Sequence, residues 1–196
     1  MLSIHQKLRA GHVRRWHIVA VAREQTVADH SHRVQTLTHE ILAKLGITDW
    51  NDSTLLNAME WARIHDVPEA ILGDVPSNAK DIYRAVTQQK GDLFKVAEER
   101  VDSYCAEVAD SVNDKLAGAV VKLADLAEAC NYLAIFGLGT HAKVVHQDLR
   151  QQLDRAIWQM FQDFGMETAI SLYNRMREML LSVADNSTVQ PSGVRE

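Results

Sequence analysis

Apolar residues recur at helical spacing along most of the chain, and no other feature restricts the possible folds as much. The stretch 141–163 illustrates the pattern, with apolar residues four positions apart at Val145, Leu149, Leu153 and Ile157. Such spacing places these side chains on one face of a helix. Runs that alternate apolar and polar residues are few, and the 196 residues include 3 prolines and 9 glycines. The sequence therefore predicts an all-α fold.

The size of the chain suits one domain. Of its 196 residues, 46% are hydrophobic, which is enough to fill one core, so we expect a single domain over residues 1–183 rather than two smaller ones. The end of the chain, residues 184–196, reads ADNSTVQPSGVRE. This segment is polar and contains both proline and glycine, and we predict that it is disordered.

Charge and cysteine content limit the partners and the compartment. The net charge is -5, with both signs spread along the chain, which argues against binding to a nucleic-acid polymer. A small anionic substrate needs only two or three local cations. Cys105 and Cys130 lack the spacing of a disulfide or metal motif, so we expect free thiols in a reducing compartment. No signal peptide and no membrane span are recognisable, which predicts a soluble, cytoplasmic protein.

The segment WARIHDVPEAILGDVP, residues 61–76, gathers acidic groups at the end of an apolar helical stretch. His65 and Asp66 are adjacent, Glu69 follows the histidine by four residues, and Asp74 lies just beyond a glycine. Such groups are costly to desolvate unless they are paired or bind a metal. A divalent cation would explain them all, with Glu69 placed to move the proton of a bound water. An exposed helix end with scattered charges is the other interpretation, so further ligands must come from elsewhere.

Two other predicted helices supply isolated polar groups. His30 lies in the first turn of one of them. Asp125 lies in the strongly apolar stretch 116–136 and is surrounded by leucine and alanine. A carboxylate in such surroundings needs a strong partner, and both Lys122 and Glu128 lie one helical turn away from it.

A compact basic and aromatic group, Arg14, Arg15 and Trp16, comes before these helices. One interpretation is a surface arginine beside a core tryptophan. The functional interpretation is that Arg15 binds a phosphate through charge-assisted hydrogen bonds and that Trp16 stacks against a base or a sugar.

The order of the candidate ligands along the chain resembles a known superfamily. His30, the adjacent His65 and Asp66, and Asp125 occur as H…HD…D, which resembles the HD-domain phosphohydrolases, where such a set holds a divalent metal in a helical bundle. Four segments are also similar to one branch, the bacterial 5′-deoxynucleotidases of the YfbR type and the phage dATP triphosphohydrolases of the DatZ type. These segments are RRW at 14–16, QTVADHS at 25–31, HDVPEAILGDVP at 65–76 and KLADLAEA at 122–129.

The resemblance implies a role for each matching residue. The implied metal ligands are His30, His65, Asp66 and Asp125. Glu69 would assist catalysis near the attacking water, and Asp74 would lie near the sugar and the leaving group. Arg15 and Trp16 would hold the nucleotide, and Lys80 would contact phosphate. Glu24 and Gln25, which precede the His30 motif, would approach the base or the sugar.

The implied activity is hydrolysis of the 5′-phosphate ester of a deoxyribonucleotide. A site of imidazole and carboxylate ligands suits one divalent transition metal, Co, Mn, Zn or Fe(II), without choosing among them. The product besides the deoxynucleoside would be phosphate or tripolyphosphate. The WHI sequence after Arg15 resembles the phage forms and favours the triphosphate substrate, dATP especially.

Two alternatives to this enzyme are an HD fold that binds a nucleotide without turnover and a purely structural helical protein. A buried Asp125 and the clustered acids argue against the structural alternative. Relatives oligomerise, so a homo-oligomer, dimer or larger, is expected.

Overall fold

The computed structural model describes residues 2–87, 96–97, 100–111, 115–165 and 174. Within these ranges the chain is helical and has no strand, which confirms the predicted fold class; its isolated bridges pair Arg14 with Thr26 and Val21 with Gly137. The sequence also predicts a helix over residues 166–183, of which the structure describes residue 174, and the predicted disordered tail lies outside the described residues. Within the described part of the chain, no helix is long and apolar enough to cross a membrane.

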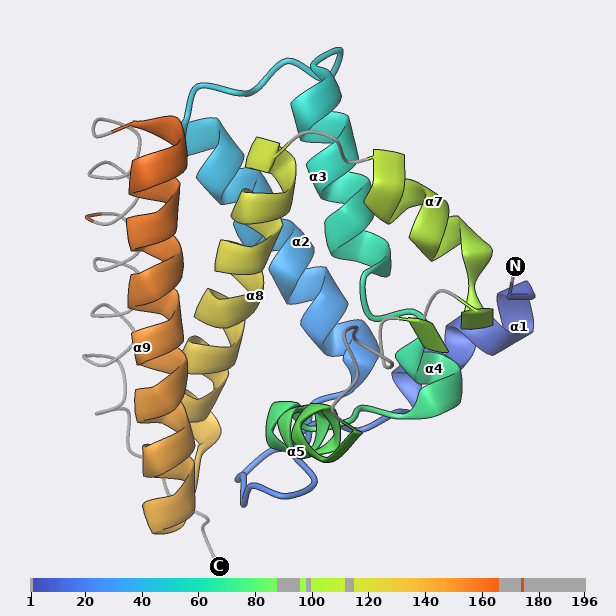
Figure 1. Ribbon diagram of the computed structural model, residues 1–196, viewed down its shortest axis with the longest axis vertical. Helices are drawn as coiled ribbons and strands as arrows, with labels where there is room; N and C mark the ends of the chain where they lie inside the picture. Colours follow the sequence, from blue (N-terminus) through green and yellow to red (C-terminus); the bar gives the residue numbers. More distant parts are fainter. Residues whose placement is uncertain (1, 88–95, 98–99, 112–114, 166–173, 175–196) are drawn as a thin grey trace, which may run out of the picture.

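The helices differ widely in length. In chain order they are α1 (Ile4–Lys7), a 3₁₀ turn (Leu8–Gly11), α2 (Val27–Lys44), α3 (Ser53–Ile64), α4 (Glu69–Leu72), α5 (Ser77–Thr87), α7 (Ser103–Ser111), α8 (Lys115–Phe136) and α9 (Gly139–Phe164). In Figure 1, α8 lies between α9 on one side and α2 and α3 on the other, with α7 beyond α3. The long helices thus form a bundle, and the short ones gather at its end.

Helix α8 is the centre of this bundle because it is apolar on nearly all its faces. It packs against α2, α3 and α9, and most of its residues from Val120 to Leu133 are buried. Among the larger side chains that share this core are Leu42 of α2, Leu55 of α3 and Leu153 of α9, each no more than 2% exposed. A polar residue on α8 is therefore held in a fixed and largely dry position.

Local sequence explains where the helices begin and end. The sequence predicts that a helix opens at Ala28, but α2 begins one residue earlier. Thr26 caps it, and the Thr26 hydroxyl oxygen accepts a hydrogen bond from the N–H of Asp29. Ser53 is of a residue type that can cap α3, but in the structure it is the first residue of the helix. Asp52 is the cap instead, since its carboxylate accepts a hydrogen bond of 2.7 Å from the N–H of Thr54 and an acidic group is favoured at a helix N-terminus.

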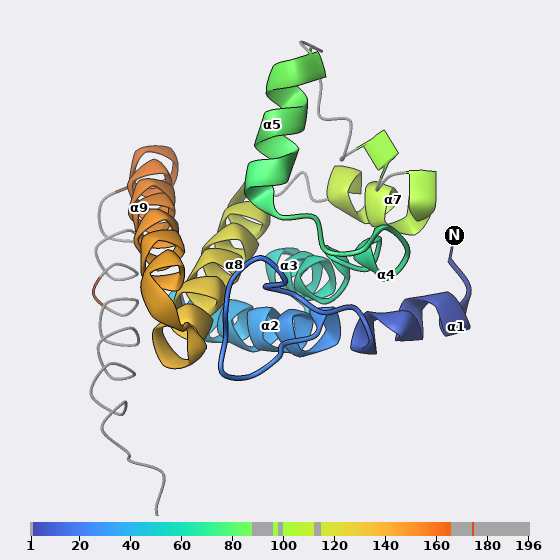
Figure 2. The ribbon, with the colours of Figure 1, turned by 90° about the horizontal axis from the view of Figure 1, so that it is seen from below.

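Two irregular segments lie beside the end of the bundle. The first is the loop between the 3₁₀ turn and α2, which is closed by a hydrogen bond from Arg15 N–H to the Gln25 carbonyl at 2.8 Å. The second follows α3, where the chain turns into α4 and then passes Gly73, whose φ of 79° suits a residue without a side chain. Helix α5 follows and stands out from the layer of α2, α3 and α8 (Figure 2).

Candidate metal and nucleotide site

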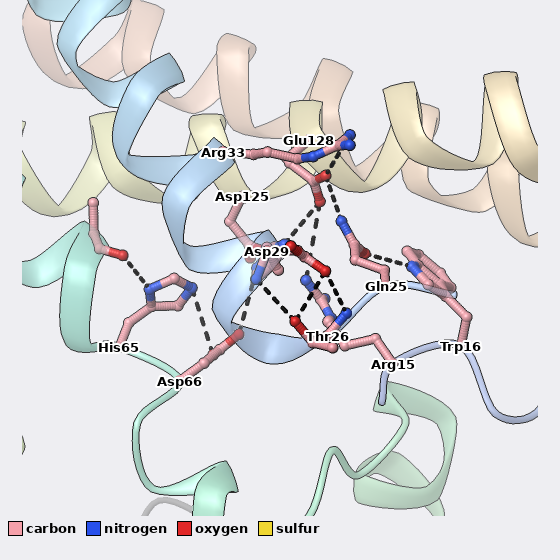
Figure 3. A network of polar contacts seen from close by, with 12 residues as sticks. Arg15, Trp16, Gln25, Thr26, Asp29, Arg33, His65, Asp66, Asp125 and Glu128 are labelled. Atoms are coloured by element: carbon pink, nitrogen blue, oxygen red, sulfur yellow. Dashed lines mark hydrogen bonds and ion pairs between the residues drawn. The ribbon is translucent and has the colours of Figure 1, made fainter. Parts of the chain in front are cut away.

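Four side chains from three parts of the bundle meet at its end, and Figure 3 labels His65, Asp66 and Asp125 among them. His30 comes from the first turn of α2, His65 from the C-terminus of α3, Asp66 from the residue after it, and Asp125 from α8. The Nε2 atom of His30 lies 3.3 Å from Asp125 Oδ1 and 3.4 Å from Asp66 Oδ2. The Nε2 atom of His65 lies 3.5 Å from Asp66 Oδ1. The structure therefore brings together all the residues expected to bind metal.

The two imidazoles are oriented by bonds on their other nitrogen. The Nδ1 atom of His30 lies 2.7 Å from a carboxylate oxygen of Glu128, and that of His65 lies 2.9 Å from the carbonyl oxygen of Ala62. Because both partners are acceptors, each Nδ1 carries the proton and donates it. Both Nε2 atoms are buried and form no hydrogen bond. Each ring therefore presents Nε2 to the carboxylates, as metal-binding histidines do.

The charges of this cluster also suit a cation. Burial opposes the ionisation of Asp125, yet the contacts with His30 and Lys122 hold its pKa well below the ordinary value. Burial likewise opposes the ionisation of Asp66, but His65, His30 and Arg15 lower its pKa. Two ionised carboxylates and two imidazole nitrogens therefore share one small space. Ligand atoms of His30, His65 and Asp125 lie within 4.8 Å of one another, so the donor set and its spacing fit one divalent ion.

A cavity of about 500 Å³ opens beside these residues. Its wall carries the carboxylates of Asp66 and Asp125 and the cationic side chains Arg15, Lys80 and Lys122. Apolar side chains line it too, among them Val19 of the loop before α2, Leu126 of α8 and Leu149 of α9. A cavity of this size, lined by both apolar and charged side chains, suits a small organic molecule with an anionic part.

Glu69 and Asp74 face the same cavity. Glu69 is 8% exposed, and its Oε2 atom has no hydrogen-bond partner. Burial together with the charges of Asp66 and Asp74 raises the pKa of Glu69 to about 9. Glu69 therefore holds a proton at neutral pH in the metal-free protein. A carboxyl group with a strongly raised pKa in a cleft is typical of a functional site.

Arg15 is a buried cation at the cavity wall. Its side chain is 14% exposed, and its Nη1 atom lies 4.0 Å from Glu128 Oε2 but forms no hydrogen bond. Burial opposes its positive charge, but Asp66, Asp125 and Asp74 raise its pKa above the ordinary value. The sequence left open whether Arg15 is a surface residue, and the structure instead buries it with an N–H group free for a ligand.

Trp16 combines both interpretations that the sequence allowed. Its ring stacks on Tyr132 with centroids 5.9 Å apart and packs against the smaller core cluster, yet it also lines the cavity. Its φ of 64° is positive, which is uncommon for a residue other than glycine. Its indole N–H donates a hydrogen bond of 2.7 Å to the side chain of Gln25.

One sequence-based expectation is wrong, and one residue of the site has a role that the sequence did not predict. Gln25 does not reach toward a ligand, because it is 1% exposed and its amide is bonded to Trp16 and Glu128. Of the two charged residues one helical turn from Asp125, Lys122 is its partner at 3.0 Å, whereas Glu128 contacts His30. The spacing of three residues from Asp125, on a helix predicted to be buried, was the available signal that Glu128 belongs to the site.

Comparison with known proteins identifies the family. The family model described as 5′-deoxynucleotidase YfbR-like matches residues 4–133, which include all the residues expected to bind metal. The chain belongs to this YfbR-like family. It is 31% identical over 153 residues to the dATP triphosphohydrolase of Cyanophage S-2L, covering 78% of this chain and 82% of that relative. It is 30% identical over 145 residues to the dATP triphosphohydrolase of Acinetobacter phage SH-Ab 15497, covering 69% and 68% of the two chains.

Solved structures agree with this family. The Cyanophage S-2L HD phosphohydrolase (DatZ), bound to dA and one catalytic Zn²⁺ ion, matches with a TM-score of 0.74 and 25% identity over 93% of this chain and 98% of that one. A conserved hypothetical protein from Pyrococcus furiosus matches with a TM-score of 0.58 and 25% identity over 93% and 99% of the two chains. The likeness to DatZ confirms the predicted HD-domain bundle.

Proposed function

We propose that this chain is a metal-dependent phosphohydrolase that cleaves the 5′-phosphate ester of a deoxyribonucleotide and releases the deoxynucleoside. One observation carries the proposal: the unbonded Nε2 atoms of His30 and His65 face the carboxylates of Asp66 and Asp125 at the edge of a cavity of about 500 Å³. Family membership and the two curated dATP triphosphohydrolases support the class of substrate.

The metal ligands in this proposal are His30, His65, Asp66 and Asp125. The ion bound there would supply Lewis acidity, polarising the phosphate and lowering the pKa of a water molecule. A divalent ion is supported by the one catalytic Zn²⁺ of the related cyanophage structure. The mixed nitrogen and oxygen ligands admit Co, Mn or Zn, so the choice among these metals is a question for the assay.

Arg15 and Lys80 bind the phosphate in this proposal, and Glu69 and Asp74 move protons. The unbonded Nη1 group of Arg15 can donate a charge-assisted hydrogen bond to a phosphate oxygen of the bound substrate. Glu69 carries a proton at neutral pH, with a pKa of about 9, and lies on the cavity wall where the leaving sugar oxygen or the water would be. Asp74 lines the same wall and lies on the sugar side.

The nucleoside occupies the part of the cavity between Trp16 and the apolar residues of α8 and α9. Trp16, held by Tyr132 and Gln25, supplies a rigid aromatic edge there. We propose dATP as the preferred substrate, with tripolyphosphate as the second product, because both curated relatives are dATP triphosphohydrolases. A dNMP 5′-deoxynucleotidase is the second candidate, and the description of the matching family favours it.

We also propose that residues 1–183 form one domain, that the chain works as a homo-oligomer, dimer or larger, and that it acts in the cytoplasm on free nucleotides rather than on a nucleic-acid polymer. These proposals rest on the sequence and on the family. Light scattering coupled to size-exclusion chromatography measures the oligomeric state directly.

The test is an incubation of the purified protein with Co²⁺, Mn²⁺, Zn²⁺ or Mg²⁺ and each dNMP and dNTP in turn, with chromatography of the products. We expect deoxyadenosine and tripolyphosphate, mainly from dATP. Deoxynucleoside and phosphate from several dNMPs would replace the triphosphate proposal with the deoxynucleotidase. Saturable nucleotide binding without turnover under every metal would contradict the enzyme and indicate a binding module.

A further inference from the structure

A chain of hydrogen bonds buried inside the bundle connects the cavity wall to His30. Trp16 Nε1 donates to Gln25 Oε1 at 2.7 Å, Gln25 Nε2 donates to Glu128 Oε1 at 2.7 Å, and Glu128 Oε2 lies 2.7 Å from His30 Nδ1. Figure 3 shows Gln25 between Trp16 and Glu128. Gln25, Glu128 and His30 are each no more than 1% exposed. The four groups therefore form one continuous chain of hydrogen bonds. All of its members except Trp16 are shielded from water.

The chemistry of the two ends fixes the direction of every bond along this path. An indole N–H can only donate, so the Gln25 amide must present its oxygen to Trp16 and its nitrogen to Glu128. A carboxylate accepts on both oxygens, and Glu128 therefore accepts from Gln25 on one and from His30 Nδ1 on the other. His30 is left with a bare Nε2 atom, and this atom lies between Asp66 and Asp125.

Charges around Glu128 keep it in this arrangement. Arg33 Nη1 lies 3.7 Å from Oε1, and Arg15 Nη1 lies 4.0 Å from Oε2. These two cations lie on opposite oxygens of the buried side chain and help to hold it in place. Each oxygen of Glu128 thus faces one hydrogen-bond donor and one cation, so neither oxygen is available to a ligand in the cavity.

We propose that Glu128 is a positioning residue, which holds His30 with Nε2 toward the metal, and that Gln25 holds Glu128 in place from the loop that carries Trp16. This inference rests on the proposed role of His30 as a metal ligand. If Glu128 has this role, the position of Trp16 in the cavity wall and the orientation of His30 depend on the same hydrogen bonds. Partners of this kind typically contribute 10- to 100-fold to metal affinity.

The first experiment compares Zn²⁺ affinity, by competition with a chromophoric chelator, in the wild type, Glu128→Gln and Glu40→Gln. Glu40 lies exposed on α2, the helix of His30, so Glu40→Gln is a matched control without a site contact. The amide in Glu128→Gln has the shape of the carboxylate, but its N–H₂ must face either Gln25 or His30, both donors. We expect Zn²⁺ affinity to fall about 10- to 100-fold in Glu128→Gln and to stay unchanged in the control.

The outcomes separate this inference from the proposed function. Failure of the wild type to bind Zn²⁺ would contradict the proposed function itself. Wild-type binding with equal affinity in a folded Glu128→Gln variant would overturn the inference alone. Circular dichroism establishes folding. The ¹⁵N NMR spectrum of the Zn-loaded wild type is independent of any variant: a protonated Nδ1 on His30 supports the inference, and a protonated Nε2 contradicts it.

Gln25→Met tests the second step of the path. Methionine fills a similar volume but donates no hydrogen bond to Glu128. We expect a smaller loss of Zn²⁺ affinity than in Glu128→Gln, and little further loss when the two changes are combined, because both act through the same bond. Losses that add fully in the double variant would show that Gln25 acts independently of Glu128.

Discussion

The two sides of the site differ in how firmly the fold holds them. On one side, His30 and Asp125 lie on long helices that pack in the main core, and His30 is 0% exposed. On the other side, Glu69, Asp74 and Lys80 lie on the four-residue helix α4, the turn after it and α5. Helix α5 exposes large apolar side chains, among them Ile82 (64%) and Val86 (75%). The fold therefore fixes the metal side before a substrate arrives, whereas the substrate side has room to adjust.

Variants on the two sides of the site should therefore have different effects. Changes to the metal ligands, which include Asp66 in the turn after α3, should remove the metal and with it all activity, because each change leaves the ion one ligand fewer. Changes on the α4–α5 side should leave the metal in place and alter kcat or KM. Metal content and steady-state kinetics, measured on the same preparations, are the two readouts that distinguish them.

Asp66→Ala should have the largest effect. Asp66 contacts both imidazoles at 3.4 and 3.5 Å, so its loss removes one ligand and part of the negative charge that attracts the cation. We expect no retained metal after dialysis and activity at background, with an unchanged helical circular dichroism spectrum. Asp154→Ala, at an exposed position on α9, is the control for a lost acidic group. Full activity in Asp66→Ala would contradict the assignment of the site.

Glu69→Gln should lower activity strongly and retain the metal. Glutamine keeps the shape of the side chain but cannot transfer a proton, and general acid–base groups typically contribute about 10²- to 10⁴-fold to the rate. We expect kcat to fall by a factor in this range, with metal content, measured by elemental analysis, equal to that of the wild type. Loss of the metal in Glu69→Gln would place Glu69 with the ligands and remove the distinction between the two sides.

Arg15→Ala should weaken substrate binding more than it slows chemistry. A charge-assisted hydrogen bond contributes about 1.5–3 kcal/mol, which corresponds to a fall of about 10- to 150-fold in kcat/KM. Arg14→Ala is the matched control, because Arg14 is exposed and pairs with the exposed Glu24 at 2.6 Å. An equal loss in both variants would mean that the effect is general electrostatic attraction rather than contact with phosphate.

The sequence predicts those residues of the site that can be recognised from their near neighbours in the chain. His65 and Asp66 are adjacent, and helical periodicity alone shows that Asp125 is an isolated acid in an apolar helix. Glu128 carries the same local signal, but its role depends on Gln25 and His30, which are 103 and 98 residues away. Spacing along one helix made Asp125 the obvious neighbour of Glu128, and only the packing of α2 against α8 shows that His30 is its partner.

Helix boundaries show a similar limit. The sequence predicts the end of α2 at Gly46, and its φ of 79° explains why glycine is used there. It does not distinguish Asp52 from Ser53 as the cap of α3, because both residue types cap helices. The choice depends on the conformation of the preceding loop, in which Asp52 has the extended backbone of a cap.

The smallest expected effect concerns the pH dependence of stability in the metal-free protein. Burial and the charges of Asp66 and Asp74 raise the pKa of Glu69 from 4.5 to about 9. The folded state therefore binds this proton more tightly than the unfolded chain, so the contribution is fully present below 4.5 and is lost as the pH rises through about 9. The raised pKa of His30 acts in the same direction above its ordinary value of 6.5, whereas Asp66 and Asp125 titrate in more acidic solution.

With a chelator present, we therefore expect the Tm of the wild type to fall between about pH 5 and pH 9, and the Tm of Glu69→Gln to fall less, since that variant lacks the Glu69 contribution. Each kcal/mol of the Glu69 contribution corresponds to about 2–4 °C in a chain of this size. Calorimetric scans across this range measure the difference. Identical slopes for the two proteins would mean that Glu69 is solvated in the metal-free state and that its burial does not raise its pKa.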